Sequence, residues 1–307
     1  MPALPYITAV EAGPCDWPRL VNALQTGHHG AKAEIADQFL HRGDDVLLSR
    51  AAWIDGQGVG VKTVTVLPGN VAKGLPSVQG AMLVFDDVTG APRALIDSAL
   101  ITRWKTAADS VLGARLLARG DARHLLIIGA GSVAASLIEA YSAVLPGIER
   151  ITVWNRTIAK AEALAADYPS VEVAQDLQAA LAEADIVSTA TMSSVPVLPG
   201  AMLKTGTHVD LIGAFTATMR EADDDVLRRG RIFVDARETT LDHIGELMIP
   251  LAAGTIQRGD VLGDLRDLVA GTVGRQGDDD ITVFKNGGGA HLDLMTCRYI
   301  LEAWNNR

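Results

Sequence analysis

The chain has little cysteine, few aromatic residues and no long apolar run. Cys15 and Cys297 are its two cysteines in 307 residues, too few and too far apart for a disulfide framework or a cysteine-based metal site. No apolar stretch approaches the ~20 residues that a transmembrane helix needs. The first residues lack both the basic and the apolar segments of a secretory signal. We therefore expect a cytoplasmic protein with no membrane partner and no bound metal.

Basic residues are also scarce. The chain has 27 Lys and Arg against 37 Asp and Glu, a formal net charge of −10. Because nucleic-acid binding depends on clustered Lys and Arg that contact phosphates, we expect no nucleic-acid partner. The length suits two domains, each with its own core.

The most informative segment that is present is a glycine turn after the apolar run 125–128. Such a run is typical of a parallel strand covered on both faces. Gly129 would allow a tight turn, Gly131 would let a pyrophosphate approach the backbone, and Ala134 is small enough for close helix packing. The amides at the start of a helix over residues 132–144 would face the phosphates. The predicted cofactor contacts here are Gly129, Ala130, Gly131, Ser132 and Val133; a βα turn without a ligand is the alternative.

The end of the next predicted strand, residues 151–154, indicates which dinucleotide binds. Sites specific for NAD place Asp or Glu there, about 20 residues past the glycines, to bind the ribose 2′-hydroxyl. This chain has Asn155, Arg156 and Thr157 instead. A guanidinium can pair with a 2′-phosphate, which a carboxylate would repel. We therefore expect NADPH as the preferred cofactor, with NADH as the alternative; for Arg156 the alternative is a solvated surface arginine.

The first third of the chain predicts a mixed region with a β-meander. Residues 16–25 and 31–41 have apolar positions at helical spacing and predict two helices. Further along, alternation and turn residues predict four strands, at 46–52, 59–66, 81–85 and 92–97, the last two forming a hairpin.

After a predicted helix at 106–119, strands alternate with helices. The predicted strands are 125–128, 151–154, 171–173, 186–189, 208–211, 232–234 and 281–285, and the intervening helices include 159–167, 177–183 and 224–229. This alternation predicts an α/β Rossmann domain with a doubly wound parallel sheet over residues 119–289. A closing helix at 291–304 is expected to return to the first domain. That domain would be mixed α+β and discontinuous, made of residues 1–118 with 290–307.

Motifs spread over nearly the whole chain resemble the ornithine cyclodeaminase/μ-crystallin family. They lie at residues 61–66, 68–70, 74–80, 101–108, 129–134 and 154–157. The resemblance implies a substrate-binding and dimerisation domain, a nucleotide-binding domain and a homodimer. The family includes cyclodeaminases, ketimine reductases and alanine dehydrogenases, so the resemblance alone leaves the reaction open.

Segments 210–223 and 284–293 look most like the Δ1-pyrroline-2-carboxylate reductase branch of the family. Cyclodeaminases carry an aspartate that acts on the substrate amine, and this chain has Phe215 at that position. Without that carboxylate, deprotonating an ammonium group becomes difficult. The resemblance therefore implies an NAD(P)H-dependent ketimine reductase that reduces Δ1-pyrroline-2-carboxylate to L-proline. Since one methylene discriminates by only ~1–3 kcal/mol, reduction of Δ1-piperideine-2-carboxylate to L-pipecolate is a further expectation. The alternatives are ornithine cyclodeaminase and a non-catalytic, NADPH-dependent ligand-binding protein of μ-crystallin type.

The resemblance also implies which residues bind the small cyclic imino acid. Lys62 matches the family's strand lysine, which we assign to the substrate carboxylate and to proton transfer near the imine. Lys105 stands where the family has an arginine; it preserves the charge but not the planar bidentate geometry. Arg50 is similar in placement to a further family arginine, with a surface arginine as the alternative. Phe215 would form an apolar wall beside the ring, or simply pack in the core.

Four further candidates lie near the expected nucleotide or at the closing helix. His291 titrates near neutrality in its ordinary state and could supply a proton, with Asp293 as its structural partner; alternatively, both simply begin a helix. Thr106 could contact the cofactor or cap a helix. Thr191 and Met192 follow the fourth Rossmann strand, where loops line the cofactor ribose and nicotinamide.

Overall fold

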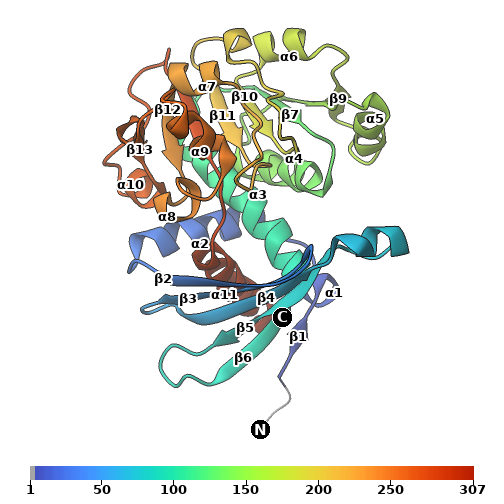
Figure 1. Cartoon of the computed structure of the whole chain (residues 1–307), viewed down its shortest axis with the longest axis vertical. Helices are drawn as coiled ribbons and strands as arrows, with labels where there is room; N and C mark the ends of the chain where they lie inside the picture. The colour runs from blue at the N-terminus through green and yellow to red at the C-terminus, as the bar shows by residue number, and fades with distance from the viewer. Residues whose placement is uncertain (1–3) are drawn as a thin grey trace. The chain divides into compact units, whose positions relative to one another are not determined.

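A computed structural model describes residues 4–307, which divide into two compact units (Figure 1). Unit 1 is Met1–Lys105 with Gly289–Arg307, and unit 2 is Thr106–Gly288. The boundary lies earlier than the expected residue 119, because the later turns of helix α3 (Ser98–Leu117) pack in unit 2. There the Asn286 side chain donates to the Thr106 carbonyl oxygen, and a Cβ at Gly113 would touch the Phe284 ring.

Within the described residues, unit 1 is built on a six-stranded sheet with the order β1-β6-β5-β4-β3-β2. Its strands are β1 (Tyr6–Ile7), β2 (Glu34–Arg42), β3 (Asp45–Ile54), β4 (Gly58–Val66), β5 (Val78–Phe85) and β6 (Pro92–Asp97). All neighbours are antiparallel except β1 and β6. The helical elements of unit 1 are α1 (Ala9–Ala12), α2 (Trp17–His29), η1 (Pro68–Lys73) and α11 (Ala290–Asn305). Helix α11 packs on the sheet, since a Cβ at Gly60 would touch Leu294.

The predicted helix at 31–41 is wrong, because this segment forms the edge strand β2, every residue of which pairs with β3. Ile35, Phe39 and Leu40 have the spacing of a helical apolar face, but in the strand Phe39 and Leu40 point to opposite faces of the sheet. All nine residues of β2 are exposed. An edge strand without a buried face lacks the clean apolar alternation that identifies a strand from sequence.

Unit 2 contains a parallel sheet of eight strands with the order β13-β12-β14-β11-β10-β7-β8-β9. The strands are β7 (His124–Ile128), β8 (Arg150–Trp154), β9 (Val171–Val173), β10 (Ile186–Thr189), β11 (His208–Leu211), β12 (Gly230–Val234), β13 (Val261–Gly263) and β14 (Ile281–Lys285). The helices after α3 are α4 (Ser132–Val144), α5 (Ile158–Ala166), α6 (Leu177–Glu183), α7 (Asp224–Arg229), α8 (Arg237–Thr240), α9 (Gly245–Ala252) and α10 (Leu265–Val269). This confirms the predicted α/β fold with a doubly wound parallel sheet.

The strands of unit 2 are apolar because helices cover the sheet. All five residues of β7 are buried, as are those of β10, β11 and β14. Strand β13 was not predicted, since three residues that include a glycine carry no recognisable period. Among residues 4–307, no helix is long and apolar enough to cross a membrane.

Candidate active site

A row of charged side chains crosses the sheet of unit 1 from β2 to β4. Asp37 pairs directly with Arg50, and Arg50 with Lys62. Directly paired residues of antiparallel strands project to the same face, so the three side chains lie side by side. Arg50 contacts Asp37 with its Nη2 atom 2.5 Å from Oδ2 and its Nε atom 3.3 Å from Oδ1.

Asp293 of helix α11 meets this row at Lys62. Its Oδ2 atom lies 2.6 Å from the Nζ atom of Lys62, and the side chains of Lys62 and Asp293 are 7% and 0% exposed. Burial alone would raise the pKa of Asp293, but Lys62, Lys105 and Arg50 outweigh it and hold that pKa below its ordinary value. Asp293 is therefore an ionised carboxylate that fixes the Lys62 ammonium in a buried position.

These side chains leave an excess of positive charge on the side of the unit 1 sheet where Asp293 of α11 contacts Lys62. We call Arg50, Lys62, Lys105, His291 and Asp293 the cationic cluster. Lys105 is buried and acts electrostatically on both His291 and Asp293. Among the described members of the row and cluster, three cations face two carboxylates, Asp37 and Asp293. Such a site favours one further anionic group, and a carboxylate suits both the lysines and the arginine.

The prediction that His291 titrates near neutrality is wrong in this setting. Burial, together with the positive charges of His28 and Lys105, lowers the pKa of His291 to about 3. The rings of His28 and His291 lie edge to face with centroids 5.9 Å apart. Nδ1 of His28 lies 2.7 Å from the Leu24 carbonyl oxygen and must carry the proton, because a carbonyl only accepts. His291 is therefore a neutral ring at pH 7, not an imidazolium acid.

Unit 2 carries a pocket of about 330 Å³ at the carboxyl ends of β7, β8 and β10. It is lined by Gly129, Ala130, Gly131, Trp154, Asn155, Arg156, Thr157, Lys160, Ala190, Thr191, Met192, Ser193 and Val197. Eight of the predicted cofactor contacts are in this set, from Gly129 to Met192. Ser132 and Val133 instead begin helix α4 beneath the turn.

The glycine turn fits a dinucleotide. Gly129 has φ +121° and an added Cβ would lie 2.5 Å from the Ala190 carbonyl oxygen, so the turn requires glycine. Around Gly131, in contrast, no described atom lies within 4 Å of an added Cβ. That open space beside the backbone suits a pyrophosphate. Helix α4 starts there, and no described side chain caps its first amides, which leaves these N–H groups to donate to phosphate oxygens.

The basic end of β8 contains a second cation that the sequence analysis missed. Arg156 and Lys160 both line the pocket, and among the described residues neither forms an ion pair with an acidic side chain. Lys160 lies four residues after Arg156 in the chain and is the third residue of α5, so its closeness to Arg156 in the sequence could have identified it.

Thr106 and Phe215 do not line this pocket either. Thr106 is buried and its carbonyl oxygen accepts a hydrogen bond from Asn286. Phe215 is 59% exposed, so the expectation that it packs in the core is wrong. It lies just past Gly213, whose N–H donates to Glu221. Glu221 itself is a buried residue for which the sequence carried no signal.

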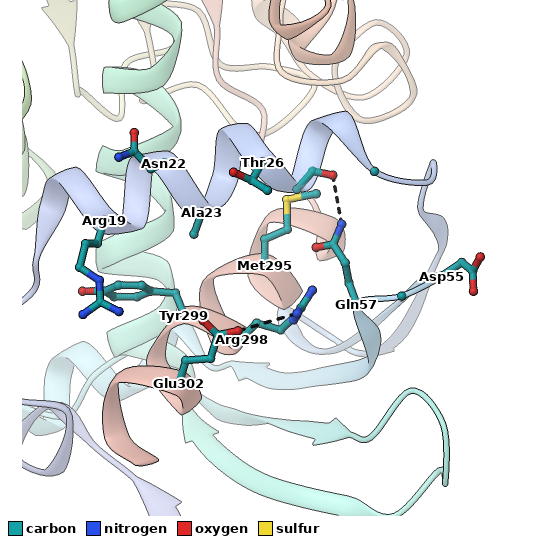
Figure 2. Close-up of a pocket in the computed structure, with 13 residues that line it drawn as sticks. Arg19, Asn22, Ala23, Thr26, Asp55, Gln57, Met295, Arg298, Tyr299 and Glu302 are labelled. Carbon is teal, nitrogen blue, oxygen red and sulfur yellow. Dashed lines mark hydrogen bonds and ion pairs between the residues drawn. The ribbon is translucent and has the colours of Figure 1, made fainter. Parts of the chain in front are cut away.

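Unit 1 has a further pocket of about 560 Å³ between α2, α11 and the turn after β3 (Figure 2). Figure 2 shows Arg19 and Asn22 on α2, Gln57 on the turn, and Arg298 pairing with Glu302 on α11. No member of the cationic cluster lines it.

The fold and the glycine-turn pocket define a dinucleotide-binding protein of the Rossmann class. A model of the ornithine cyclodeaminase/mu-crystallin family matches residues 22–307, and the chain belongs to this family. It is 58% identical over 293 residues to the Δ1-pyrroline-2-carboxylate reductase of Paracoccus denitrificans, covering 94% of this chain and 93% of that protein.

Two solved structures resemble the chain over almost its full length. One is the Thermococcus litoralis Δ1-pyrroline-2-carboxylate reductase in complex with NADH and L-proline, with a TM-score of 0.91, 27% identity and coverage of 99% of this chain and 98% of that one. The other is an archaeal alanine dehydrogenase dimer with bound NAD, with a TM-score of 0.90, 26% identity and coverage of 99% and 96%.

Proposed function

We propose that this chain is an oxidoreductase that reduces the C=N bond of Δ1-pyrroline-2-carboxylate to give L-proline, with a reduced nicotinamide dinucleotide as the hydride source. The observation that carries the proposal is the buried cationic cluster, in which Asp293 fixes Lys62 beside Arg50. A small 2-carboxylate is the ligand that matches this charge. The named activity of the 58% identical Paracoccus relative agrees with it.

The reaction adds a hydride to the imine carbon and a proton to the imine nitrogen, so that a secondary amine and an oxidised cofactor result. Lys62, Lys105 and Arg50 would hold the substrate carboxylate and orient the ring. Because His291 is neutral at pH 7, the Lys62 ammonium is the better proton donor within the cluster. Asp293 holds that lysine in place. His291 would serve as a neutral hydrogen-bonding group beside the ring.

Phe215 favours imine reduction over cyclodeamination. It occupies the position where the family's cyclodeaminases carry the aspartate that acts on the substrate amine. A phenyl group can neither take up a proton nor form an ion pair with an ammonium. Reduction of a preformed imine needs no such carboxylate.

We further propose NADPH as the preferred cofactor, held by the residues that line the unit 2 pocket and by the first amides of α4. Arg156 and Lys160 supply two cations where NAD-specific sites carry a carboxylate. A 2′-phosphate would pair with both. The solved neighbours contain NADH or NAD, so NADH remains the competing cofactor in the test.

Two finer expectations also belong to the proposal. The six-membered imine that yields L-pipecolate should be a second substrate, since a single methylene changes binding by only ~1–3 kcal/mol. The chain should form a homodimer, for which unit 1 offers exposed apolar residues, Phe39 and Leu40 on β2 and Trp53 on β3. An archaeal neighbour of similar fold is a dimer.

The test follows NADPH absorbance while purified protein is mixed with each cyclic imine at mildly acidic pH, and separately measures ammonia released from ornithine with NAD. We expect cofactor oxidation with the five-membered imine and no ammonia. Ammonia release would replace the proposal with ornithine cyclodeaminase. Stoichiometric NADPH binding without turnover of either imine would indicate a ligand-binding protein.

A further inference from the structure

Glu221 is a completely buried carboxylate that does not line the cofactor pocket, yet it contacts two of the loops at the carboxyl edge of the unit 2 sheet. It lies between β11 and α7. Its Oε1 atom accepts the backbone N–H of Thr191 at 2.7 Å and the Thr191 hydroxyl at 2.7 Å. Its Oε2 atom accepts the Gly213 N–H at 2.6 Å and the Thr189 hydroxyl at 2.8 Å. These four donors match the roughly four acceptor positions of an ionised carboxylate.

The main chain of Glu221 holds the same wall of the pocket. Its carbonyl oxygen accepts the N–H groups of Val197 at 2.7 Å and Leu198 at 2.9 Å. The neighbouring Arg220 N–H donates to the Ser193 carbonyl oxygen at 2.9 Å. One residue therefore anchors both ends of the segment 191–197, from which Thr191, Met192, Ser193 and Val197 line the pocket.

The two loops approach each other closely beside the carboxylate, so that position 213 has room only for glycine. A Cβ at Gly213 would lie 1.8 Å from the Thr191 carbonyl oxygen and 2.6 Å from Oε1 of Glu221. Glu246 of α9, also buried, supports the arrangement from behind, because its two oxygens accept the N–H groups of Glu221 and Ala222 at 2.8 and 3.0 Å. The segment is thus fixed from several sides, with Glu221 at its centre.

We propose that Glu221 is a positioning residue for the cofactor: it holds the Thr191–Val197 wall in the conformation that binds the dinucleotide. This deepens the proposed function but rests only on its cofactor site, not on the identity of the imine. Glu221 touches neither the cofactor nor the substrate. It acts through its hydrogen bonds to Thr191 and thereby through the Thr191–Val197 wall of the pocket.

Glu221→Gln is the sharpest test, because each carboxylate oxygen receives one backbone N–H. A hydroxyl could turn to accept from the new amide, but a backbone N–H cannot. Whichever way the glutamine side chain is oriented, its NH₂ group must face the N–H of Thr191 or of Gly213. The variant therefore displaces one of the two loops.

We expect the Kd of Glu221→Gln for NADPH, measured by fluorescence titration, to rise about ten-fold or more, while the KM for the imine at saturating cofactor stays near wild type. The control is Asp185→Asn, at the opposite edge of the sheet, where Oδ2 of Asp185 accepts the N–H groups of Arg123 and His124 and Oδ1 pairs with Lys204. This control should lower Tm without weakening NADPH binding.

An unchanged Kd in Glu221→Gln, or an equal rise in the control, would overturn the proposal. If Glu221→Gln does not fold, Thr191→Val removes only the hydroxyl donor and keeps the side-chain shape. We expect a rise of about three-fold or more in the NADPH Kd of that variant, and no rise would overturn the proposal as well. Because binding is measured without imine, failure here is distinct from failure of the proposed reaction.

Discussion

At the scale of single residues, the proposed preference for NADPH rests on two cations, Arg156 after β8 and Lys160 in α5. Arg156→Glu or Lys160→Glu would place a carboxylate where we expect the 2′-phosphate. Loss of a charge-assisted hydrogen bond costs ~1.5–3 kcal/mol, so the preference for NADPH over NADH should fall about ten- to hundred-fold. The measurement is kcat/KM for each cofactor.

The control for this prediction is Arg123→Glu, which changes a surface arginine that pairs with Glu149 outside the pocket. It should leave the NADPH to NADH ratio unchanged. An unchanged ratio in both pocket variants would refute the role assigned to Arg156 and Lys160.

The buried pair of Lys62 and Asp293 makes a second prediction at this scale. Asp293→Asn leaves the Lys62 ammonium without its carboxylate in a site where both side chains are nearly inaccessible. Breaking such a pair costs ~3–5 kcal/mol of unfolding free energy, which urea denaturation can measure. We also expect the KM for the imine to rise, because Lys62 would no longer be held in place.

Asp121→Asn is the matched variant, because the exposed pair of Arg119 and Asp121 lies in solvent. Exposed pairs contribute little, so this change should leave stability near that of the wild type. Equal losses in the two variants would contradict the role of burial in the Lys62–Asp293 pair.

Several properties of these residues depend on contacts between segments that are far apart in the chain, which sequence patterns do not predict. The family motif identifies Lys62, but its pairing partner Arg50 depends on the strand register. The low pKa of His291 comes from burial and from His28 on α2, far away in the chain. The four donors around Glu221 come from two segments, Thr189 with Thr191 at the end of β10 and Gly213 after β11. Composition and spacing predict none of these distances.

At the scale of secondary-structure elements, the two glycines of the turn between β7 and α4 should respond differently to alanine. Gly129→Ala places a Cβ against Ala190 in a backbone conformation that favours glycine, so we expect a lower Tm. Gly131→Ala meets no described atom within 4 Å and its φ of −96° is open to any residue. It should keep a Tm near wild type and lose NADPH affinity, since its methyl group occupies the phosphate space.

Thermal unfolding and NADPH titration of Gly129→Ala and Gly131→Ala check these two predictions. Normal NADPH binding in Gly131→Ala would contradict the placement of the pyrophosphate at this turn.

Elements with a strong period or a buried face were predicted well. Strands β7 and β14 and helices α4, α6 and α7 lie close to their expected bounds, because continuous burial or a regular apolar face specifies them. The elements at the edges of the sheets were predicted poorly. Strand β2 has no buried residue, and β13 is only three residues long, so tertiary pairing rather than local sequence determines both.

At the scale of the whole molecule, buried ionisable groups couple stability to pH. Burial, followed by the charge of Arg275, lowers the pKa of His208 to about 3. The unfolded chain therefore binds a proton at this site below about pH 6.5 that the folded protein does not. As the pH falls from about 6.5 to 3, this site lowers the free energy of unfolding by about 1.4 kcal/mol for each pH unit.

Buried carboxyl groups act in the opposite direction. Burial raises the pKa values of Asp210 and Glu246 to about 7, so the folded protein retains protons that the unfolded chain releases above about pH 4. These groups therefore lower the free energy of unfolding as the pH rises from about 4 to 7. They oppose His208 and His291 over the same range and flatten the wild-type stability profile.

The variant His208→Gln removes the contribution of His208 to the pH dependence of stability. Relative to the wild type, the variant should gain about 1.4 kcal/mol of unfolding free energy for each pH unit of acidification below about 6.5. Urea denaturation at a series of pH values measures the difference. Parallel curves for the two proteins would show that His208 is not buried in its neutral form.

The central claim is that a hydride passes from the nicotinamide to the imine carbon of a cyclic 2-carboxylate. The most direct test uses NADPH deuterated at both C4 positions with Δ1-pyrroline-2-carboxylate in ordinary water, and analyses the proline by mass spectrometry. The account predicts one deuterium at Cα for each cofactor oxidised. Proline without deuterium, or no proline at all, would contradict it.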